Sequence, residues 1–449
     1  MGIDVRLTRQ DHSIVEDDRA QSQYAPQDAR VWWMVRLLLF CMIHVREGEM
    51  GRACDDRQMR FSKRTDWNTA ESELAKAYRQ RKEAGLPIAD LTASNPTRCG
   101  FTYDGELLAA LTDARALDYD PQPRGLQAAR EAVCAYYAGH GVDLDAEQIV
   151  LTTSTSEAYS FLLRLLCDAG DEILVPQPGY PLFDFLAVLD DVRLKATPLV
   201  YDYGWQIDPE GFRRAITPKS KAIALVHPNN PTGHFTKVWE AEELAAICRE
   251  FGLSLIVDEV FLDYGFGAAQ ASFASGIDGV PVFVVSGLSK IAGLPQMKAA
   301  WIVATGPAHE QALDRLEIIA DTFLSMNAPV QWAMGKWLAG REGIQRQIRA
   351  RIAGNLAELD RQLADQGTIE RLKVEGGWYA TLRIPAIQPD EQTVLELLEQ
   401  GIWVHPGYFF GMPESGWLVT SMLAPEPEFG TGVTTLVASL GKHQGGNKV

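Results

Sequence analysis

The sequence predicts an α/β fold, in which a large domain with a mostly parallel central sheet flanked by helices is joined to a smaller α/β domain. From about residue 125 onward, short and almost wholly apolar runs alternate with helical stretches. This alternation is typical of a parallel sheet that is covered on both faces. The chain has 449 residues, which is too many for one small core and suits two or three packed lobes.

The elements of the large domain are predicted from apolar runs and their spacing. Helices are expected at 125–138, 157–167 and 240–251, and strands at 148–152, 172–175, 222–226, 253–257, 282–285 and 300–303. Before them, a helical pattern over 67–83 ends at Gly85-Leu86-Pro87, which is a typical stop signal. A short strand at 88–91 then leads into a loop that contains Asn95.

The last third of the chain changes character and predicts the second, smaller lobe. Helices are expected at 311–324, 330–338, 345–366 and 391–399, and strands at 372–382 and 403–404. We therefore expect an N-terminal arm and part of the small domain at 59–110, the large domain at 111–335, and the rest of the small domain at 336–449.

Residues 1–58 match neither lobe. A polar, acidic stretch over 1–30 precedes an apolar run at 31–45 that contains Arg36. This run is shorter than a membrane span, and it lacks the basic start of a signal peptide. We interpret 1–58 as a non-native or disordered extension, with translation starting at Met59. The alternative is a membrane-surface or regulatory segment.

The composition excludes several classes of protein. A net charge of −17 repels phosphate backbones, so we expect no nucleic-acid partner. The six cysteines are scattered and form no CxxC pair, which argues against a disulfide framework or a cysteine-based metal site. We therefore expect a cytoplasmic protein without a bound metal and without a membrane partner.

Two of four local signals contain small polar residues after a predicted strand. Ser154, Thr155 and Ser156 begin a helix, where backbone N–H groups and hydroxyls can hold a phosphate; taken alone, however, the pattern favours a simple N-cap run. The string Pro-Asn-Asn-Pro-Thr-Gly at 228–233 is typical of a tight loop, from which the Asn230 amide can donate to a ligand oxygen.

The other two signals carry charge next to buried strands. Asp258 ends an apolar run, where a carboxylate needs a cation such as a protonated pyridine nitrogen; a salt bridge to a local arginine or an N-cap is the alternative. Lys290 stands in Ser-Gly-Leu-Ser-Lys after another apolar run. Partial burial there lowers the pKa of the amine and makes it a nucleophile, whereas most lysines are simply exposed.

Together these motifs resemble fold-type I, pyridoxal-phosphate-dependent aminotransferases of class I and II, over about residues 66–440. The resemblance implies a large domain that binds pyridoxal 5'-phosphate. Lys290 then resembles the lysine that holds the cofactor as a Schiff base and later acts as general acid and base. Asp258 resembles the partner of the ring nitrogen, which keeps the ring an electron sink, and Asn230 resembles the donor to its phenolic oxygen.

The resemblance also implies the rest of the cofactor site. Tyr180 resembles the aromatic residue that stacks on the ring. Tyr119 resembles the tyrosine that reaches the phosphate from a neighbouring subunit, which implies a homodimer with shared active sites. The phosphate site is matched by Ser154, Thr155, Ser156 and Ser289, with Lys298 at the position usually filled by arginine.

Four positions depart from the family pattern. Phe261 replaces a tyrosine that donates to the phenolic oxygen, Gly287 replaces a phosphate-binding serine, and Lys298 lacks the fork of an arginine. The arginine that binds the substrate carboxylate aligns with Val419, and no arginine occurs from residue 384 to the end. Arg98, with Asn95 in the same loop, is our candidate for binding the substrate.

The resulting functional prediction is a transaminase that moves the amino group of an α-amino acid to a 2-oxo acid. Aromatic residues at the expected pocket rim favour a neutral or aromatic amino donor. Those residues are Phe101, Trp378, Tyr379, Tyr408, Phe409 and Phe410. A β-lyase or an amino-acid decarboxylase on the same scaffold is an alternative. A non-catalytic regulator is a further alternative, although 1–58 shows no helix-turn-helix.

Overall fold

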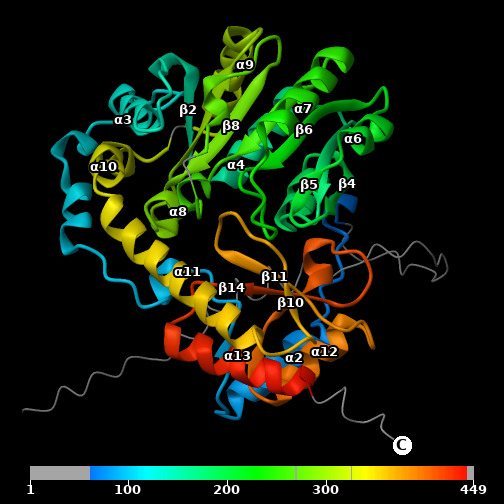
Figure 1. Ribbon diagram of the computed structural model, residues 1–449. Helices are drawn as coiled ribbons and strands as arrows, with labels where there is room; N and C mark the ends of the chain where they lie inside the picture. The colour runs from blue at the N-terminus through cyan, green and yellow to red at the C-terminus, as the bar shows by residue number, and fades with distance from the viewer. Residues whose placement is uncertain (1–60, 268–269, 325, 442–449) are drawn as a thin grey trace, which may run out of the picture.

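The computed structural model describes residues 61–267, 270–324 and 326–441 (Figure 1). The apolar run at 31–45 and the expected start at Met59 lie outside the described residues. Within the described part of the chain, none of the helices is both long and apolar enough to cross a membrane.

An eight-stranded sheet, ordered β2-β9-β8-β7-β6-β3-β4-β5, forms the centre of the large lobe. Strands β8, β7, β6, β3 and β4 are parallel neighbours, whereas β9 and β5 run antiparallel to theirs. The predicted, mostly parallel sheet is therefore confirmed. The strands are β2 Ile149–Thr152, β3 Glu172–Gln177, β4 Arg193–Tyr201, β5 Trp205–Ile207, β6 Ser220–Val226, β7 Ser254–Asp258, β8 Val282–Gly287 and β9 Ala300–Thr305.

The central strands are buried along their whole length because helices cover both faces of the sheet (Figure 1). In β7, Leu255 and Val257 belong to the core cluster that includes α3, α7 and α10, while Ile256 belongs to the cluster that includes α4 and α9. This alternation follows from the two-residue period of a strand. The helices are α3 Gln127–Ala138, α4 Thr155–Leu166, α5 Leu182–Leu189, α6 Pro209–Ala215, α7 Val238–Phe251, α8 Leu288–Ile291, α9 His309–Thr322 and α10 Ala328–Ala339.

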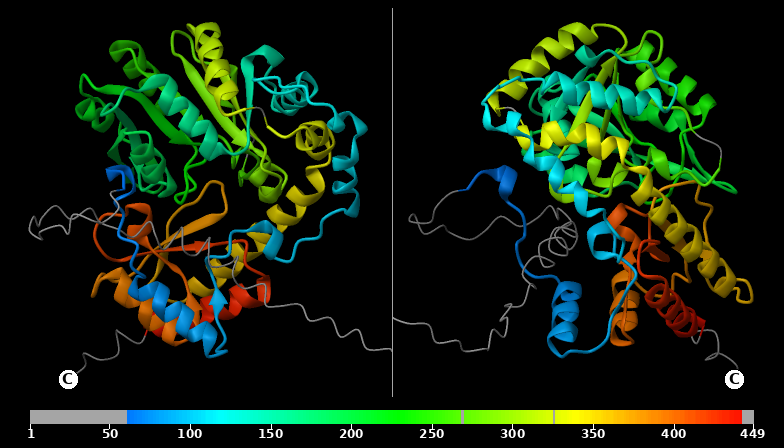
Figure 2. Two further views of the ribbon diagram at one scale, coloured as in Figure 1. Left: turned by 180° about the vertical axis from the view of Figure 1, so that it is seen from behind. Right: turned by 90° about the vertical axis from the view of Figure 1, so that its left-hand side faces the viewer.

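The small lobe has a four-stranded antiparallel sheet, ordered β10-β11-β14-β13, and a parallel pair of β1 with β12. The strands are β1 Ala89–Asp90, β10 Glu370–Arg371, β11 Tyr379–Arg383, β12 Ile402–Trp403, β13 His405–Pro406 and β14 Trp417–Ser421. The helices are α2 Glu73–Glu83, α11 Glu342–Leu363, α12 Asp390–Glu399 and α13 Glu426–Gly441. Early and late segments of the chain lie side by side here (Figure 2), which supports the domain boundaries at 110 and 335 that we propose.

Several elements differ from the sequence prediction. The strand expected at 372–382 is two strands, β10 and β11, because Gly376 and Gly377 interrupt the run in a loop. Strand β4 was not predicted, because it lies near the sheet edge and exposed residues interrupt its apolar ones. Helix α13 is rich in glycine and threonine, which are weak helix formers, and it is held by burial against α11 and β1.

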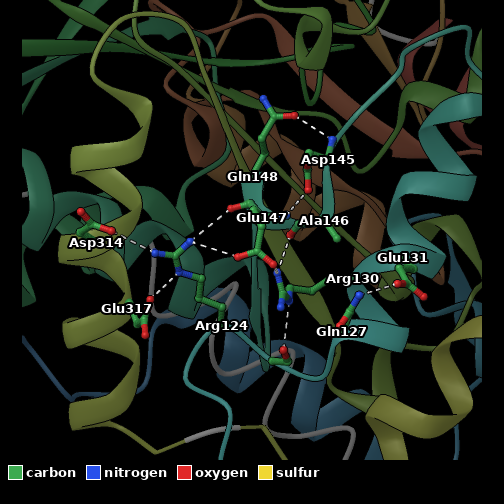
Figure 3. A network of polar contacts seen from close by, with 11 residues as sticks. Arg124, Gln127, Arg130, Glu131, Asp145, Ala146, Glu147, Gln148, Asp314 and Glu317 are labelled. Atoms are coloured by element: carbon green, nitrogen blue, oxygen red, sulfur yellow. Dashed lines mark hydrogen bonds and ion pairs between the residues drawn. The ribbon is translucent and has the colours of Figure 1, made fainter.

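A polar network fixes the segment just before α3 (Figure 3). The Arg124 guanidinium lies 2.6 Å from Glu317 and 3.1 Å from Asp314, both on α9. The Arg124 carbonyl accepts a hydrogen bond from the Leu151 N–H of β2 at 3.0 Å. The segment that follows Tyr119 is thereby held against the strand that leads to α4.

Candidate active site

Three of the four sequence signals lie at the carboxyl-terminal end of the central strands of the large sheet. Strands β6, β7 and β8 are adjacent and parallel, and their carboxyl ends lead to Asn230, Asp258 and Lys290. In open α/β sheets, ligands bind at the carboxyl ends of the strands. The fourth signal, at the start of α4, is joined to them by Tyr159 of α4, whose hydroxyl donates to Asp258 at 3.2 Å.

Asp258 is a buried carboxylate without a cationic partner in contact. Its side chain is 7% exposed, and it accepts hydrogen bonds from the Val260 N–H (3.0 Å) and the Tyr159 hydroxyl (3.2 Å). Burial raises the pKa of Asp258 to about 6, although the two hydrogen bonds and the charge of Lys290 act in the opposite direction. Among the described residues, none of the ion pairs involves an arginine and Asp258, so the local salt bridge considered above is not present. The carboxylate suits a buried cationic ligand.

Lys290 lies on α8, directly after β8, and is partly buried rather than exposed. Its Nζ atom is 5.0 Å from the ring centroid of Trp378 and 5.9 Å from that of Phe261. Burial lowers the pKa of Lys290 to about 8, against the opposing charges of Asp258 and Cys99. A substantial share of neutral amine is therefore present near physiological pH, as a nucleophile that attacks a carbonyl requires.

The loop that carries Asn230 is rigidly bound. The Asn229 side-chain amide donates to the Pro178 carbonyl at 3.0 Å and to the Thr232 hydroxyl at 2.8 Å. Gly233 has φ +69°, and a Cβ atom there would lie 2.2 Å from a Val374 methyl carbon, so only glycine fits. Asn230 is 7% exposed, and its Oδ1 atom has no hydrogen-bond partner. This oxygen is free to accept a hydrogen bond, whereas donation to a ligand oxygen would come from the Nδ2 group of the same amide.

The first turn of α4 bears on both interpretations of Ser154, Thr155 and Ser156, as an N-cap and as a phosphate site. Ser154 is the N-cap, and its hydroxyl accepts a hydrogen bond from the Glu157 N–H at 3.1 Å. The Glu157 carboxylate in turn accepts from the Thr153 N–H at 2.6 Å. Thr155 and Ser156 follow in the first turn, where the helix dipole favours an anion.

Ser289 and Lys298, the two residues near Lys290 that we expect to bind the cofactor phosphate, differ in exposure to solvent. Ser289 is partly buried, whereas Lys298 is exposed and has a left-handed backbone with φ 54°. At Gly287, a Cβ atom would lie 2.8 Å from both the Ala299 carbonyl oxygen and the Ala300 Cβ. This close packing against β9 explains why a serine does not occupy position 287.

The remaining predicted residues lie nearer the surface. Tyr180 is 41% exposed and Tyr119 is 80% exposed. Arg98 is exposed at the end of a short 3₁₀ helix, Pro96–Arg98, with no ion pair among the described residues. The Asn95 side chain caps this helix by accepting from the Thr97 N–H (3.1 Å) and hydroxyl (2.9 Å).

The predicted aromatic rim is largely core. Trp378, Phe409 and Phe410 are buried, although the indole ring of Trp378 contacts Lys290. Sequence reasoning missed Tyr159, which supports Asp258, and Tyr264, whose hydroxyl donates to the Lys290 carbonyl at 2.7 Å. Their positions within helices and turns carry no local signal that indicates which strand end they will face.

The position that lacks the expected arginine is surrounded by uncharged side chains. Val419 on β14 pairs with Thr381 on β11 and with His405 on β13, and all three are buried. Neither the Thr381 hydroxyl oxygen nor His405 Nδ1 has a hydrogen-bond partner. Burial lowers the pKa of His405 to about 3, so this imidazole is neutral at physiological pH.

Comparisons with known proteins agree with this geometry. The family model for aminotransferases of class I and II matches residues 106–427. A glutamate-pyruvate aminotransferase from Haemophilus influenzae is 27% identical over 355 residues, covering 76% of this chain and 87% of that protein. An alanine aminotransferase from Mycobacterium tuberculosis is 28% identical over 388 residues, covering 77% and 89%.

Solved structures share the same fold. An aminotransferase from Escherichia coli superposes with a TM-score of 0.75 at 25% identity, covering 82% of this chain and 95% of that one. An alanine aminotransferase from Pyrococcus furiosus superposes with a TM-score of 0.78 at 24% identity, covering 85% and 100%. The fold expected from the sequence is thus found in known aminotransferases.

The residues present fit the cofactor of this family, pyridoxal 5'-phosphate. Asp258 is a buried carboxylate that forms no ion pair among the described residues, and the partly buried amine of Lys290 has a lowered pKa. The Asn230 side-chain amide is not held by a protein partner at its oxygen. The cofactor, when bound, supplies an electron sink and carries the amino group. The chain therefore belongs to the class I and II aminotransferases and is an amino-acid transaminase that uses pyridoxal 5'-phosphate.

Proposed function

We propose that Lys290, Asp258 and Asn230 perform the transfer of an amino group from a neutral or aromatic α-amino acid to a 2-oxo acid. The observation that carries this proposal is the placement of a partly buried lysine and a buried aspartate at the ends of adjacent strands. Lys290 holds the cofactor carbon and moves the proton at the substrate Cα. Asp258 keeps the ring nitrogen protonated, and Asn230 donates to the phenolic oxygen.

A single-turnover experiment tests this proposal and identifies the donor. The loaded protein is mixed with each of a panel of amino acids without a 2-oxo acid, and the absorbance of the cofactor is followed. Transamination converts the cofactor stoichiometrically to its amine form, whereas a β-lyase or a decarboxylase returns it unchanged. The absence of conversion by every amino acid in the panel would contradict the proposal.

The phosphate of the cofactor is proposed to lie at the start of α4. The first-turn N–H groups and the hydroxyls of Ser154, Thr155 and Ser156 would hold it. The Ser154 hydroxyl accepts a hydrogen bond as the helix cap and keeps its own O–H to donate. Ser289 and Lys298 are proposed to complete this site from the segment around Lys290. Tyr180, in the loop before α5, is proposed to stack on the ring.

We also propose a cytoplasmic homodimer with shared active sites. Tyr119 and Leu117 are 80% and 89% exposed, which is unusual for large apolar side chains in a segment held rigidly by Arg124. A second copy that covers this segment would bring Tyr119 to its phosphate site. The described cysteines, Cys99, Cys134, Cys167 and Cys248, are free thiols, which supports a reducing compartment.

Arg98→Ala is expected to raise the Michaelis constant for the amino donor by more than about tenfold, because a charge-assisted hydrogen bond to the α-carboxylate would be lost. The uncharged row of Thr381, Val419 and His405 offers that carboxylate no cation at the position where the family has its arginine. Steady-state kinetics measure the effect. Arg346→Ala, at an exposed position of α11, is the control, and an unchanged Michaelis constant for Arg98→Ala would exclude this role.

Phe261→Tyr is expected to restore a donor to the phenolic oxygen. Phe261 is buried, and its ring lies 5.3 Å from that of Trp378 and 5.9 Å from Lys290 Nζ. A hydroxyl there stabilises the charged oxygen and should lower the pH midpoint of the visible absorbance change of the bound cofactor by about one pKa unit. A pH titration measures this midpoint, with Phe409→Tyr as a buried aromatic control. An unmoved midpoint would show that the hydroxyl does not reach the ring.

A further inference from the structure

A buried ionic cluster lies directly behind the loop that carries Asn230. His234 is 3% exposed, and its Nε2 atom lies 2.9 Å from Glu240 Oε2, whereas its Nδ1 atom lies 3.7 Å from Glu375 Oε2. Lys237 pairs with the same oxygen of Glu375. The roles proposed above for the active site use none of these four residues.

The cluster joins segments that are far apart in the sequence. Glu240 is fully buried at the start of α7 and accepts hydrogen bonds from the Ile207 N–H of β5 at 2.7 Å and the Lys237 N–H at 2.6 Å. Glu375 belongs to the loop between β10 and β11, in the small lobe. His234 therefore connects an anchored carboxylate of the large lobe with a carboxylate of the small lobe.

The loop that contains Glu375 also forms one wall of the active site. Its backbone is held by hydrogen bonds from the Glu375 N–H to the Gly233 carbonyl (3.2 Å) and from the Gly377 N–H to the Tyr264 carbonyl (3.0 Å). The next residue is Trp378, which contacts Lys290. The ionic contacts of His234 can therefore restrain two active-site residues. Asn230 lies four residues before His234, and Trp378 lies three residues after Glu375.

The charges in the cluster balance when His234 is protonated. Burial alone disfavours its charge, but the hydrogen bond to Glu240 and the contact with Glu375 outweigh burial and raise the pKa of His234 above its ordinary value. For Glu375, burial is likewise outweighed by its contacts with His234 and Lys237, which lower its pKa to about 2.

Two further basic side chains lie beside this cluster. Lys373 Nζ lies 3.7 Å from Glu375 Oε1. His227 accepts a hydrogen bond from the Thr236 N–H at Nδ1 (3.2 Å), and burial lowers its pKa to about 3, so His227 stays neutral. The pH-dependent charge of the cluster therefore belongs to His234.

We propose that His234 is a positioning residue that locks the Asn230 loop to the loop preceding Trp378, and so sets the distance between Asn230 and the phenolic oxygen of the cofactor. This inference rests on the role proposed above for Asn230. The lock matters more in this chain than where a tyrosine stands at position 261, because Phe261 offers no second donor. The lock is complete below the ordinary pKa of histidine and is lost as pH rises through the raised pKa of His234.

The test compares His234→Gln with His309→Gln, a control at the start of α9 whose ring contacts the Gly306 carbonyl. Amide hydrogen exchange is read by mass spectrometry on peptides covering 226–236 and 370–378, in cofactor-free and loaded protein. His234→Gln is expected to accelerate exchange in both peptides by at least about tenfold, since one partner of a buried ion pair is removed. The acceleration should shrink as pH rises through the raised pKa of His234.

A spectroscopic readout connects the lock to Asn230. The pH midpoint of the visible absorbance of the bound cofactor should shift in His234→Gln in the same direction as in Asn230→Ala. The double variant should shift no further than Asn230→Ala alone, because both changes affect one contact. Additive shifts, or an unshifted His234→Gln, would overturn the inference.

The outcomes separate this inference from the proposed function. Exchange in cofactor-free protein tests the lock even if the protein proves unable to bind the cofactor, which would contradict the proposed function alone. Unchanged exchange in both peptides, with transamination intact, would overturn the lock alone. If His234→Gln does not fold, Glu375→Gln removes the small-lobe partner of His234, together with the pairs of Glu375 with Lys237 and Lys373. Accelerated exchange in both peptides is expected of it as well.

Discussion

Replacing Lys290 by alanine is expected to lower kcat for transamination by about 10⁴-fold or more. Lys290 is the amine beside Trp378 and Phe261, and its loss removes the group that moves the proton at the substrate Cα. The measurement is steady-state kinetics with saturating cofactor. Lys336→Ala, at an exposed position of α10, is the control, and a Lys290→Ala activity within tenfold of wild type would refute the role.

The lowered pKa of Lys290 also predicts that the rate of cofactor binding depends on pH. Because burial lowers the pKa of Lys290 to about 8, half of the amine is neutral at that pH, and the neutral share levels off only about one pH unit higher. The rate of covalent capture of pyridoxal 5'-phosphate should follow this curve. Borohydride reduction followed by peptide mass spectrometry measures the capture and should locate the added mass on Lys290 in wild type.

Replacing Asp258 by asparagine is expected to lower activity by about 10³-fold or more, because the ring nitrogen loses the carboxylate that keeps it protonated. In contrast to the activity, the stability of the cofactor-free protein should increase. The folded-state pKa of Asp258, about 6, is raised above the ordinary 3.8. Its ionised form therefore opposes folding, with the cost developing between pH 4 and 6 and complete above, at most about 3 kcal/mol.

Urea unfolding of cofactor-free protein measures this effect. At pH 8, Asp258→Asn should be at least as stable as wild type, and the difference should vanish near pH 4. Glu259→Gln is a matched control, because Glu259 is adjacent, buried and bonded to Ser272 and Phe273, and burial raises its pKa to about 7. Glu259→Gln should change stability while leaving the chemistry active. Loss of stability at pH 8 with nearly full activity in Asp258→Asn would contradict the assignment.

The sequence alone was sufficient to predict the large sheet and three residues that meet at its edge. Strands β6, β7 and β8 are largely apolar runs because both faces of the sheet are covered. Once those runs are taken as parallel strands, Asn230, Asp258 and Lys290 must follow neighbouring carboxyl ends. The motifs around them are local in sequence, and local patterns are what a sequence shows directly.

Strand β4 and the C-terminal helix α13 could not be predicted from the sequence, for a physical reason. Strand β4 mixes exposed and buried residues because it lies near the sheet edge, and helix α13 owes its conformation to burial against α11 and β1 rather than to propensity. The exposure of Lys298 and the burial of Trp378 and Phe410 also depend on which surfaces the lobes present to each other.

The sequence by itself determined the fold class from its alternating apolar runs, and the cofactor from the resemblance of its motifs to a family. It also predicted the chain positions of the residues that we propose to bind that cofactor, because each stands in a short motif after an apolar run. Only the tertiary structure decided that Tyr159 supports Asp258, that Trp378 covers Lys290, and that His234 meets Glu375. These pairs lie roughly a hundred residues apart in the sequence. The first contact follows from the packing of α4 on the large sheet, and the other two follow from the packing of the small lobe against the large one. The pKa values of Asp258 and Lys290 likewise required the structure, because burial, not residue type, shifts them.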